Sequence, residues 1–165
     1  MATVKINDLV RRFKRLAELH PRINSFGCGK LDDLQQDVQK YPYVWLITEP
    51  SHTIGYTSEN KYRSIEFTFI LRVGDKKNLQ TGYDGIDGIG QDNQLDILSD
   101  TFQYALDFVN TISEDSLDMF NDVDLVYDVN VDPFYNEDDA NVCGNEASIT
   151  LRVKNDKVCI NQLTI

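Results

Sequence analysis

Alternation of apolar and polar residues is the clearest pattern in the chain, and it is strongest between Arg63 and Val73. Successive side chains of a strand point to opposite faces of a sheet, so this segment is predicted to be a strand with one apolar face. The residues of that face are Ile65, Phe67, Phe69, Leu71 and Val73. The positions between them are mostly polar, which is typical of a sheet that is covered on one side and solvated on the other.

Two later segments repeat this alternation and predict two further one-faced strands. The apolar residues of the first are Val123, Leu125, Tyr127, Val129 and Val131, and those of the second are Ala147, Ile149, Leu151 and Val153. Residues 43–48 are rich in aromatic and β-branched types and predict a buried strand. Residues 52–57 are compatible with a short strand or a loop, and residues 157–160 with a short edge strand.

Two other segments have the spacing of amphipathic helices. From Ile6 to His20 an apolar residue recurs every three or four positions, and Pro21 follows. A second stripe, which we expect to cover the strand at 63–73, consists of Leu95, Leu98, Phe102, Ala105, Leu106, Val109 and Ile112. A shorter helix is expected at residues 31–40 after a turn-rich segment at 23–30. This order favours a single α+β domain over residues 1–165, with a mostly antiparallel sheet and helices packed on one face.

Two long loops are predicted to interrupt the regular elements. Residues 75–92 are too rich in glycine for regular structure and too long for an ordinary connection, so we expect them to contact a partner. The candidate contact residues are Tyr83, Asp84, Ile86, Asp87 and Ile89. Asp84, Asp87 and Asp92 also suggest calcium, but isoleucine occupies the third position of either EF-hand register, where an oxygen ligand is required. An acidic loop is expected at residues 133–142.

Charge is distributed unevenly along the chain. The formal net charge is −11, and residues 1–30 carry seven basic and two acidic side chains, a net of +5, which leaves −16 for the remainder. Phosphate contacts need cations, so the acidic body argues against nucleic-acid binding. Opposite charges on different parts of one chain suggest contacts between copies, although a simple solubility charge explains them equally well. The candidate subunit interface joins Arg11, Arg12, Lys14 and Arg15 to Asp122, Asp124, Asp128 and Asp132.

Candidate chemistry is sparse. The three cysteines lie far apart and fit neither a disulfide framework nor a zinc motif. His20, at the end of an apolar stripe, is expected to pack or cap rather than to bind a metal. We therefore predict no catalytic residue, no metal site and no cofactor. The chain also has no run of about 18 or more apolar residues and no apolar centre near its N-terminus, which predicts a soluble, intracellular product with no membrane partner.

Three segments carry a resemblance to a known group of proteins. They are His20–Gly29 (HPRINSFGCG), Tyr41–Trp45 (YPYVW) and Ser99–Thr101 at the start of the long helix. In these segments and in its order of elements the chain resembles small neck or tail ring proteins of crAss-like and related tailed bacteriophages that infect Bacteroidetes. Their layout is similar to that of tail terminator and tail-completion proteins.

The resemblance implies a structural virion protein of the tail or neck, made in the host cytoplasm. It implies a homo-oligomeric ring, of about six or twelve copies, at the head-to-tail junction. Portal-side and tail-side virion proteins would be its neighbours, and DNA would pass through without specific binding. Two alternatives stay open: a metal-assisted enzyme with Asp122, Asp124 and Asp128 as ligands, and a calcium-responsive module that uses the glycine-rich loop.

Overall fold

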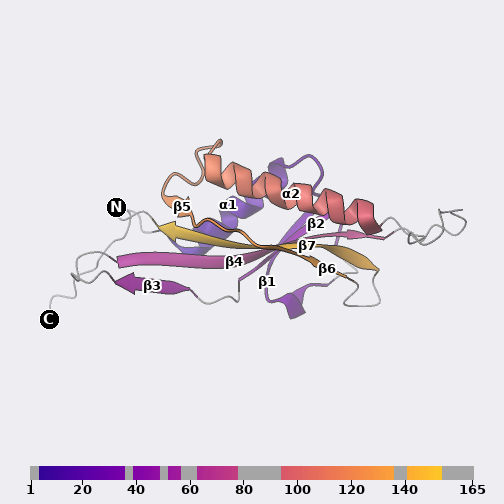
Figure 1. Ribbon diagram of the computed structural model, residues 1–165, viewed down its shortest axis with the longest axis horizontal. Helices are drawn as coiled ribbons and strands as arrows, with labels where there is room; N and C mark the ends of the chain where they lie inside the picture. Colours follow the sequence, from indigo (N-terminus) through magenta and orange to yellow (C-terminus); the bar gives the residue numbers. More distant parts are fainter. Residues whose placement is uncertain are drawn as a thin grey trace, which may run out of the picture.

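The computed structural model describes residues 4–35, 39–48, 52–56, 63–77, 94–135 and 141–153 (Figure 1). These residues form two α-helices, one 3₁₀ turn and seven strands. The helices are α1 (Ile6–Leu19) and α2 (Gln94–Glu114), and the 3₁₀ turn is η1 (Leu31–Asp33). The strands are β1 (Ser25–Gly29), β2 (Tyr43–Ile47), β3 (Thr53–Tyr56), β4 (Arg63–Lys76), β5 (Val123–Leu125), β6 (Val131–Phe134) and β7 (Val142–Val153).

The seven strands form one sheet around β4 and β7. The main path is β1-β2-β4-β7-β5, while β3 pairs with β4 and β6 pairs with β7. Every pairing is antiparallel except that of β1 with β2. The β4–β7 pairing is the longest, from Glu66 opposite Arg152 to Lys76 opposite Val142. The predicted strand at 63–73 is confirmed as the centre of the sheet.

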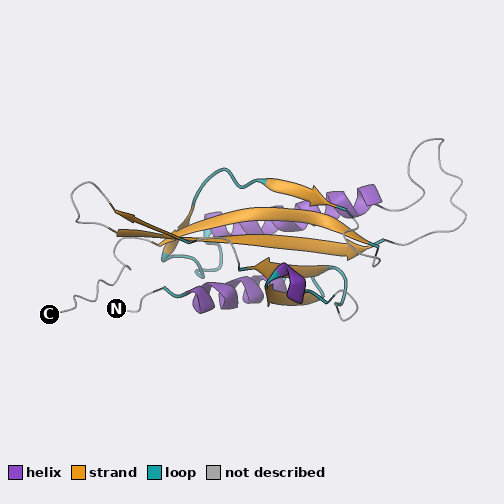
Figure 2. Cartoon of the chain, turned by 90° about the horizontal axis from the view of Figure 1, so that it is seen from below, coloured by secondary structure: helices purple, strands orange, loops and turns teal. Residues whose placement is uncertain are grey.

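Both helices lie on the same face of this sheet and enclose the main core (Figures 1 and 2). Phe13 of α1 stacks edge-to-face on Phe69 of β4, with the ring centroids 5.5 Å apart. Ala105, Phe108 and Ile112 of α2 are buried in the same cluster, against β4 and β7. Because α1 contacts β1 and β2 while α2 contacts β4, β7 and β5, the helices lie toward opposite ends of the strand order. The predicted α+β class, with helices on one face, is confirmed.

The second face of the sheet is apolar at one end, where the alternation in β4 predicted a solvated surface. A small cluster of Tyr43, Trp45, Ile47, Phe134 and Val142 is buried there. The turn η1 lies on this side of the sheet, opposite α1 and α2 in Figure 1, and Leu31 and Leu34 pack against the cluster. β2 is buried on both faces, which explains its unbroken run of apolar residues.

Two predictions for residues 23–40 are wrong. Of the helix expected at 31–40, the described residues 31–35 and 39–40 contain only η1, and the backbone at Leu34 is already extended, with ψ at 106°. The turn-rich segment at 23–30 contains β1, in which Gly27 serves packing rather than turning. A Cβ on Gly27 would lie 2.2 Å from the ring of Trp45, so only glycine lets that ring rest on the neighbouring strand.

The strand expected over residues 122–132 is also wrong as a single element. Leu125 pairs with Leu151 and Val131 with Ala147, so six steps along this segment match four along β7. The two extra residues bulge out between β5 and β6, where Asp128 has a positive φ of 72° and Tyr127 is 82% exposed. A period-two pattern does not reveal such a bulge, since two added residues keep the parity.

The apolar stripe predicted for α2 is rotated from the observed one. The buried residues are Ile97, Thr101, Ala105, Phe108 and Ile112, whereas Leu95, Phe102 and Leu106 are 66%, 48% and 37% exposed. A buried hydrogen-bond network fixes this orientation. The side-chain amide of Asn145 on β7 donates to the Leu98 carbonyl and to the Thr101 hydroxyl, both at 2.8 Å. The Thr101 hydroxyl in turn donates to the Ile97 carbonyl at 2.7 Å.

Candidate assembly surfaces

The exposed face of α1 carries basic residues that are partly neutralised by acids of the same helix. Arg11 is 80% exposed and lies 3.8 Å from Asp8. Glu18 lies 3.5 Å from Arg15 and 4.0 Å from Lys14. The sequence predicted these three cations on the polar side of the helix, and the structure places them there. Only a small net positive charge remains on this face.

Arg12 lies elsewhere, at the contact between α1 and the turn before β5. Both of its terminal nitrogens donate to the carboxylate of Asp122, one of them at 2.7 Å, and the two side chains are 22% and 16% exposed. The Arg12 guanidinium also lies 5.9 Å from the centre of the Phe120 ring. The hydrogen bonds that Arg12 donates to Asp122 raise the pKa of Arg12, although partial burial opposes this rise. Two of the eight candidate interface residues therefore bind each other within the chain.

The other candidate acids do not form one row. Asp124 on β5 is opposite Arg152 of β7, whose guanidinium also binds Glu66 of β4 at 2.6 Å. Asp132 on β6 is opposite Glu146 of β7, and Asp128 lies in the bulge between β5 and β6. Arg152 thus lies opposite Asp124, whereas Asp132 lies opposite another carboxylate, so the negative charge of this segment is offset only in part.

Arg72 is the cation that is most enclosed among the described residues and is part of the second-face cluster. It is 3% exposed, and its guanidinium stacks on the Phe134 ring with 3.6 Å between the guanidinium carbon and the ring centre. It donates to Glu146 at 2.5 Å and to the hydroxyl of Tyr43 at 3.4 Å. Burial by itself would lower the pKa of Arg72. The interactions with Tyr43 and Glu146 outweigh this effect, so the pKa of Arg72 is raised. The partners named here, Glu146, Tyr43 and Phe134, belong to the sheet itself, which favours a structural role for Arg72.

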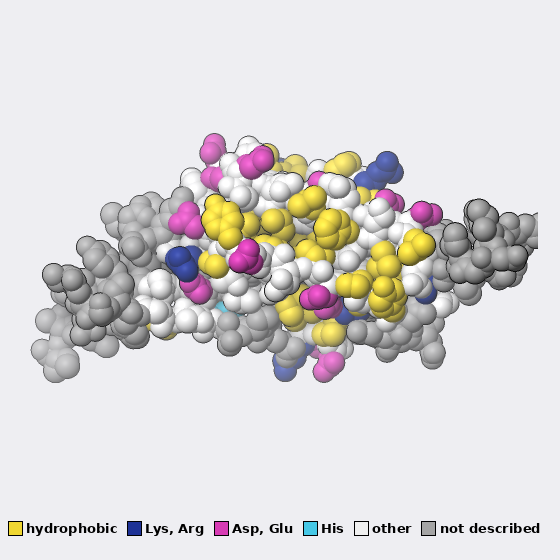
Figure 3. Space-filling view, in the orientation of Figure 1, with side chains coloured by type: hydrophobic (Ala, Val, Ile, Leu, Met, Phe, Trp, Pro, Cys, Tyr) yellow, Lys and Arg dark blue, Asp and Glu magenta, His cyan; other side chains and the backbone are white. Residues whose placement is uncertain are grey.

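The outer flank of α2 carries an apolar surface, which we call the α2 band: Leu95, Phe102 and Leu106 are exposed, and Leu98 and Val109 beside them are half-buried. Asp107 and Thr111 border the hollow next to α1, and at 3.6 residues per turn the α2 band lies on the other flank of the helix. Figure 3 shows this side of the molecule, with hydrophobic side chains gathered over α2 and the strands below it and carboxylates among them. The sequence signal was present, but it was assigned to the core.

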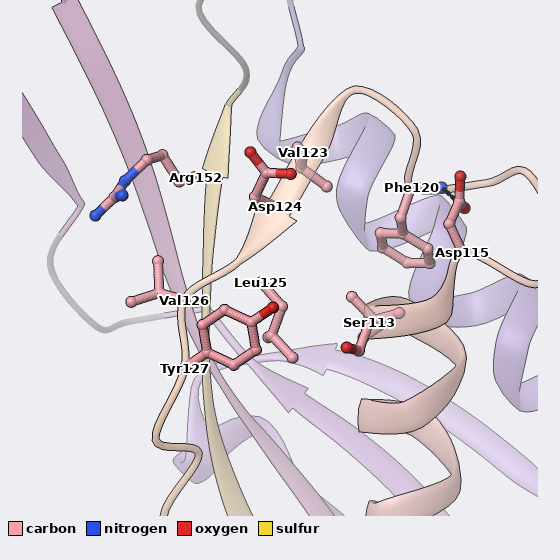
Figure 4. Close-up of a pocket in the computed structure, with 10 residues that line it drawn as sticks. Ser113, Asp115, Phe120, Val123, Asp124, Leu125, Val126, Tyr127 and Arg152 are labelled. Carbon is pink, nitrogen blue, oxygen red and sulfur yellow. Dashed lines mark hydrogen bonds between the residues drawn. The ribbon is translucent and has the colours of Figure 1, made fainter.

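A pocket of about 380 Å³ lies between the end of α2 and the β5 segment (Figure 4). Leu125 and Tyr127 face it from one side and Ser113 from the other. The charged groups at its rim do not converge, because a carboxylate oxygen of Asp115 accepts the backbone N–H of Phe120 at 2.7 Å and Arg152 is bound to Glu66. Polar and apolar groups line the pocket in similar measure, and with Asp115 and Arg152 bound elsewhere the geometry favours no pair of groups for acid–base chemistry.

A second hollow, of about 310 Å³, lies between the C-terminal end of α1 and α2. Its walls are mainly apolar and include Leu16, Leu19, Phe108 and Leu117. His20 borders it, 3.3 Å from Asp107 and stacked edge-to-face on Tyr104 with the ring centroids 5.1 Å apart. The predicted packing role of His20 is confirmed.

Asp75, near the end of β4, is a partly buried carboxylate close to α2. Burial raises the pKa of Asp75 above the ordinary value, and the negative charge of Asp100 adds to the rise. The backbone N–H of Lys76 donates a hydrogen bond to the Asp75 carboxylate at 2.7 Å, which lowers the pKa in part. Burial and the same Asp100 charge also raise the pKa of Tyr104.

Several sequence predictions fall outside the described residues. They are the candidate contact residues Tyr83, Asp84, Ile86, Asp87 and Ile89, the middle of the acidic loop at 136–140, and the edge strand at 157–160. Among the residues that are described, no group of three histidine, cysteine or carboxylate side chains is arranged to hold a metal ion. Neither α1 nor α2 has the length and apolar composition needed to span a membrane.

No protein-family model matches the chain, and no curated protein sequence matches it significantly.

Proposed function

We propose that this chain is a structural virion protein, a subunit of a closed ring at the head-to-tail junction of a tailed bacteriophage. The observation that carries the proposal is the α2 band, an apolar surface left uncovered in a chain whose described buried side-chain polar atoms all have hydrogen-bond partners. Exposed apolar patches of this kind are typical of surfaces that bind other proteins. The resemblance in residues 20–29, 41–45 and 99–101 gives the class of assembly.

The distribution of charge supports a ring through which DNA passes. Residues 94–135 contain ten carboxylates and no lysine or arginine. An acidic wall repels phosphates, so DNA would move past it without being held. Portal-side and tail-side virion proteins are the expected neighbours of such a ring, and the tail or neck of the virion is its expected location.

A catalytic function has no comparable support among the described residues. Asp122, one of the three acids considered as metal ligands, is bound to Arg12. Asp124 lies on β5 and Asp128 in the bulge that follows, and the three form no metal-binding group.

Electron microscopy of virions tests the proposal directly. A tag-specific label on this protein is expected to mark the junction between head and tail, and mass measurement of the released assembly is expected to give a whole-number multiple of 18.9 kDa. Label on the capsid surface, or virions that lack the protein, would contradict the proposed function.

A further inference from the structure

α2 has apolar side chains on two adjoining flanks. The flank that faces the sheet consists of Ile97, Thr101, Ala105, Phe108 and Ile112. Each residue turns an α-helix by about 100°, so the residues that follow the first four of these form the adjoining flank. They are Leu98, Phe102, Leu106 and Val109, which is the α2 band without Leu95. Turning the helix by one position would therefore bring a comparably apolar flank onto the sheet, and we call this the alternative orientation of α2.

The hollow of about 310 Å³ between α1 and α2 lies on the side to which this turn would carry the present core flank. Asp107 and Phe108 both line it, and its apolar walls include Leu16 and Leu117. Turning the α2 band toward the sheet moves Phe108 to the place of Asp107, beside these walls. The same turn moves Asp107 toward solvent and away from His20, which now lies 3.3 Å from it. The alternative orientation therefore has an apolar surface for the displaced side chains.

A buried amide on β7 distinguishes the two orientations. Asn145 is 5% exposed, and its side-chain nitrogen donates to the Leu98 carbonyl and to the Thr101 hydroxyl, both at 2.8 Å. In the alternative orientation Phe102 would take the place of Thr101, and its ring offers the amide no comparable hydrogen-bond partner. A buried polar group that loses its partner costs more free energy than an ordinary hydrogen bond contributes, so Asn145 opposes the alternative orientation.

We propose that Asn145 is a positioning residue that keeps α2 in the orientation with its apolar band at the surface. Without the amide, α2 turns by one position and buries Leu98, Phe102 and Leu106 against the sheet. The fold thus contains a device that decides whether the α2 band is available to other molecules. This role of Asn145 does not depend on the proposed ring function, although it controls the surface on which that function is based.

Thiol labelling of the full chain reports the orientation of α2. The background protein carries Cys28→Ser and Cys159→Ser, and the thiol that remains, on Cys143, is fully buried. One test protein adds Ile97→Cys as a probe on the buried flank. Another adds Leu106→Cys as a probe on the α2 band, where the side chain is 37% exposed. Neither substitution removes a side chain of the hydrogen-bond network, so both probes leave the amide of β7 bonded.

Asn145→Ala is expected to change the two labelling rates in opposite directions, each by about tenfold or more. The rate at Ile97→Cys should rise, because this position moves to the exposed place of Asp96. The rate at Leu106→Cys should fall, because this position moves to the buried place of Ala105. General loosening of the core would raise both rates. Rates that rise together, or that do not change, would therefore overturn the proposal.

Ile149→Val is the matched control, because Ile149 is fully buried on the same strand and its side chain makes no hydrogen bond. It is expected to lower neither labelling rate, and a fall at Leu106→Cys in this control would overturn the specific role of Asn145. Asn145→Val, which also lacks the amide, takes the place of Asn145→Ala if that variant does not fold, and the same opposite changes are expected. Both rates are measured on the monomeric chain, so the result decides the orientation of α2 whether or not the protein forms rings.

Discussion

At the scale of single residues, the bond between Arg12 and Asp122 is the contact that was least expected from the amino-acid pattern. The two residues are 110 positions apart, and both were assigned to surfaces facing other molecules. Their charges were visible in the sequence, but which carboxylate meets which cation depends on where the turn before β5 passes α1. Patterns with periods of two or four residues contain no information on such distant pairs.

A double-mutant cycle measures this bond. Arg12→Ala and Asp122→Ala, alone and together, are expected to give a coupling energy of roughly 1–3 kcal/mol in urea unfolding, because the pair is bidentate and mostly shielded from water. The matched control is Arg11 with Asp8, where the arginine side chain is 80% exposed and coupling within about 0.5 kcal/mol is expected. Equal coupling energies in the two pairs would show that the Arg12–Asp122 bond stabilises the packing of α1 no more than an exposed surface ion pair does.

Asp75 gives a prediction about pH. Because burial raises its pKa in the folded state, the fold binds this proton more tightly than the unfolded chain does. The stability from Asp75 is therefore complete below the ordinary carboxyl pKa of about 4 and is lost as the pH rises through the raised folded value. Asp75→Asn is expected to increase the free energy of unfolding at neutral pH, and this gain should vanish in acid.

The comparison for Asp75→Asn is Asp132→Asn, at an exposed position on β6. Urea unfolding of both variants across the acidic and neutral range distinguishes them. A gain of the same size in both would mean that general relief of negative charge, rather than the burial of Asp75, is responsible.

At the scale of elements, the sequence predicted those whose pattern is decided by burial on one face. The α1 stripe and the strands β4 and β7 show this, since Leu9, Phe13, Phe69 and Ile149 are buried as their periodicity indicates. α2 differs because it has two apolar flanks that share Ala105 and Ile112. Hydropathy alone does not show which of the two flanks faces the core. Tertiary contacts decide this, including the hydrogen bonds from Asn145 to Leu98 and Thr101.

The orientation of α2 leads to a direct test on two phenylalanines of the same helix. Phe108→Ala is expected to cost about 3–5 kcal/mol of unfolding free energy, because its side chain is 2% exposed and fills the core. Phe102→Ala is expected to change stability by no more than about 0.5 kcal/mol, because Phe102 lies on the surface. Thermal or urea unfolding of the monomeric protein gives both values, and a large loss in Phe102→Ala would contradict the rotated orientation.

At the scale of the whole molecule, the charge separation along the chain was predicted, but its reduction by internal pairing was not. The net of +5 over residues 1–30 suggested a strongly basic helix. In the fold, Asp8, Glu18 and Asp122 bind four of those cations. The proposed assembly is therefore expected to depend more on the apolar α2 band than on the charge of α1.

Charge reversal on α1 tests how much electrostatics contributes. Arg11, Lys14 and Arg15 are 80%, 60% and 59% exposed, so changing all three to Glu should leave the fold intact. We expect self-association to weaken about tenfold at low salt, with a smaller difference at high salt, where charges are screened within about 3–10 Å. Sedimentation velocity at two salt concentrations measures this.

The matched control for charge reversal is Arg12→Glu. It should lower the unfolding free energy because it places a carboxylate against Asp122. Unchanged association of the triple variant at physiological salt would show that α1 takes no part in the contact between copies.

The position of β7 has a consequence for the order in which the protein can be made. β7 is the last strand described, yet it pairs with β4, β5 and β6 at the middle of the sheet. While the ribosome is still adding the residues before Val142, β4 therefore lacks its longest partner, and α2 lacks one of the two main strands on which its apolar face packs. Closing contacts across so many residues is slow, so we expect folding to finish only after translation of β7. Interrupted chains would then lack a stable fold, which keeps truncated subunits from competing with complete ones.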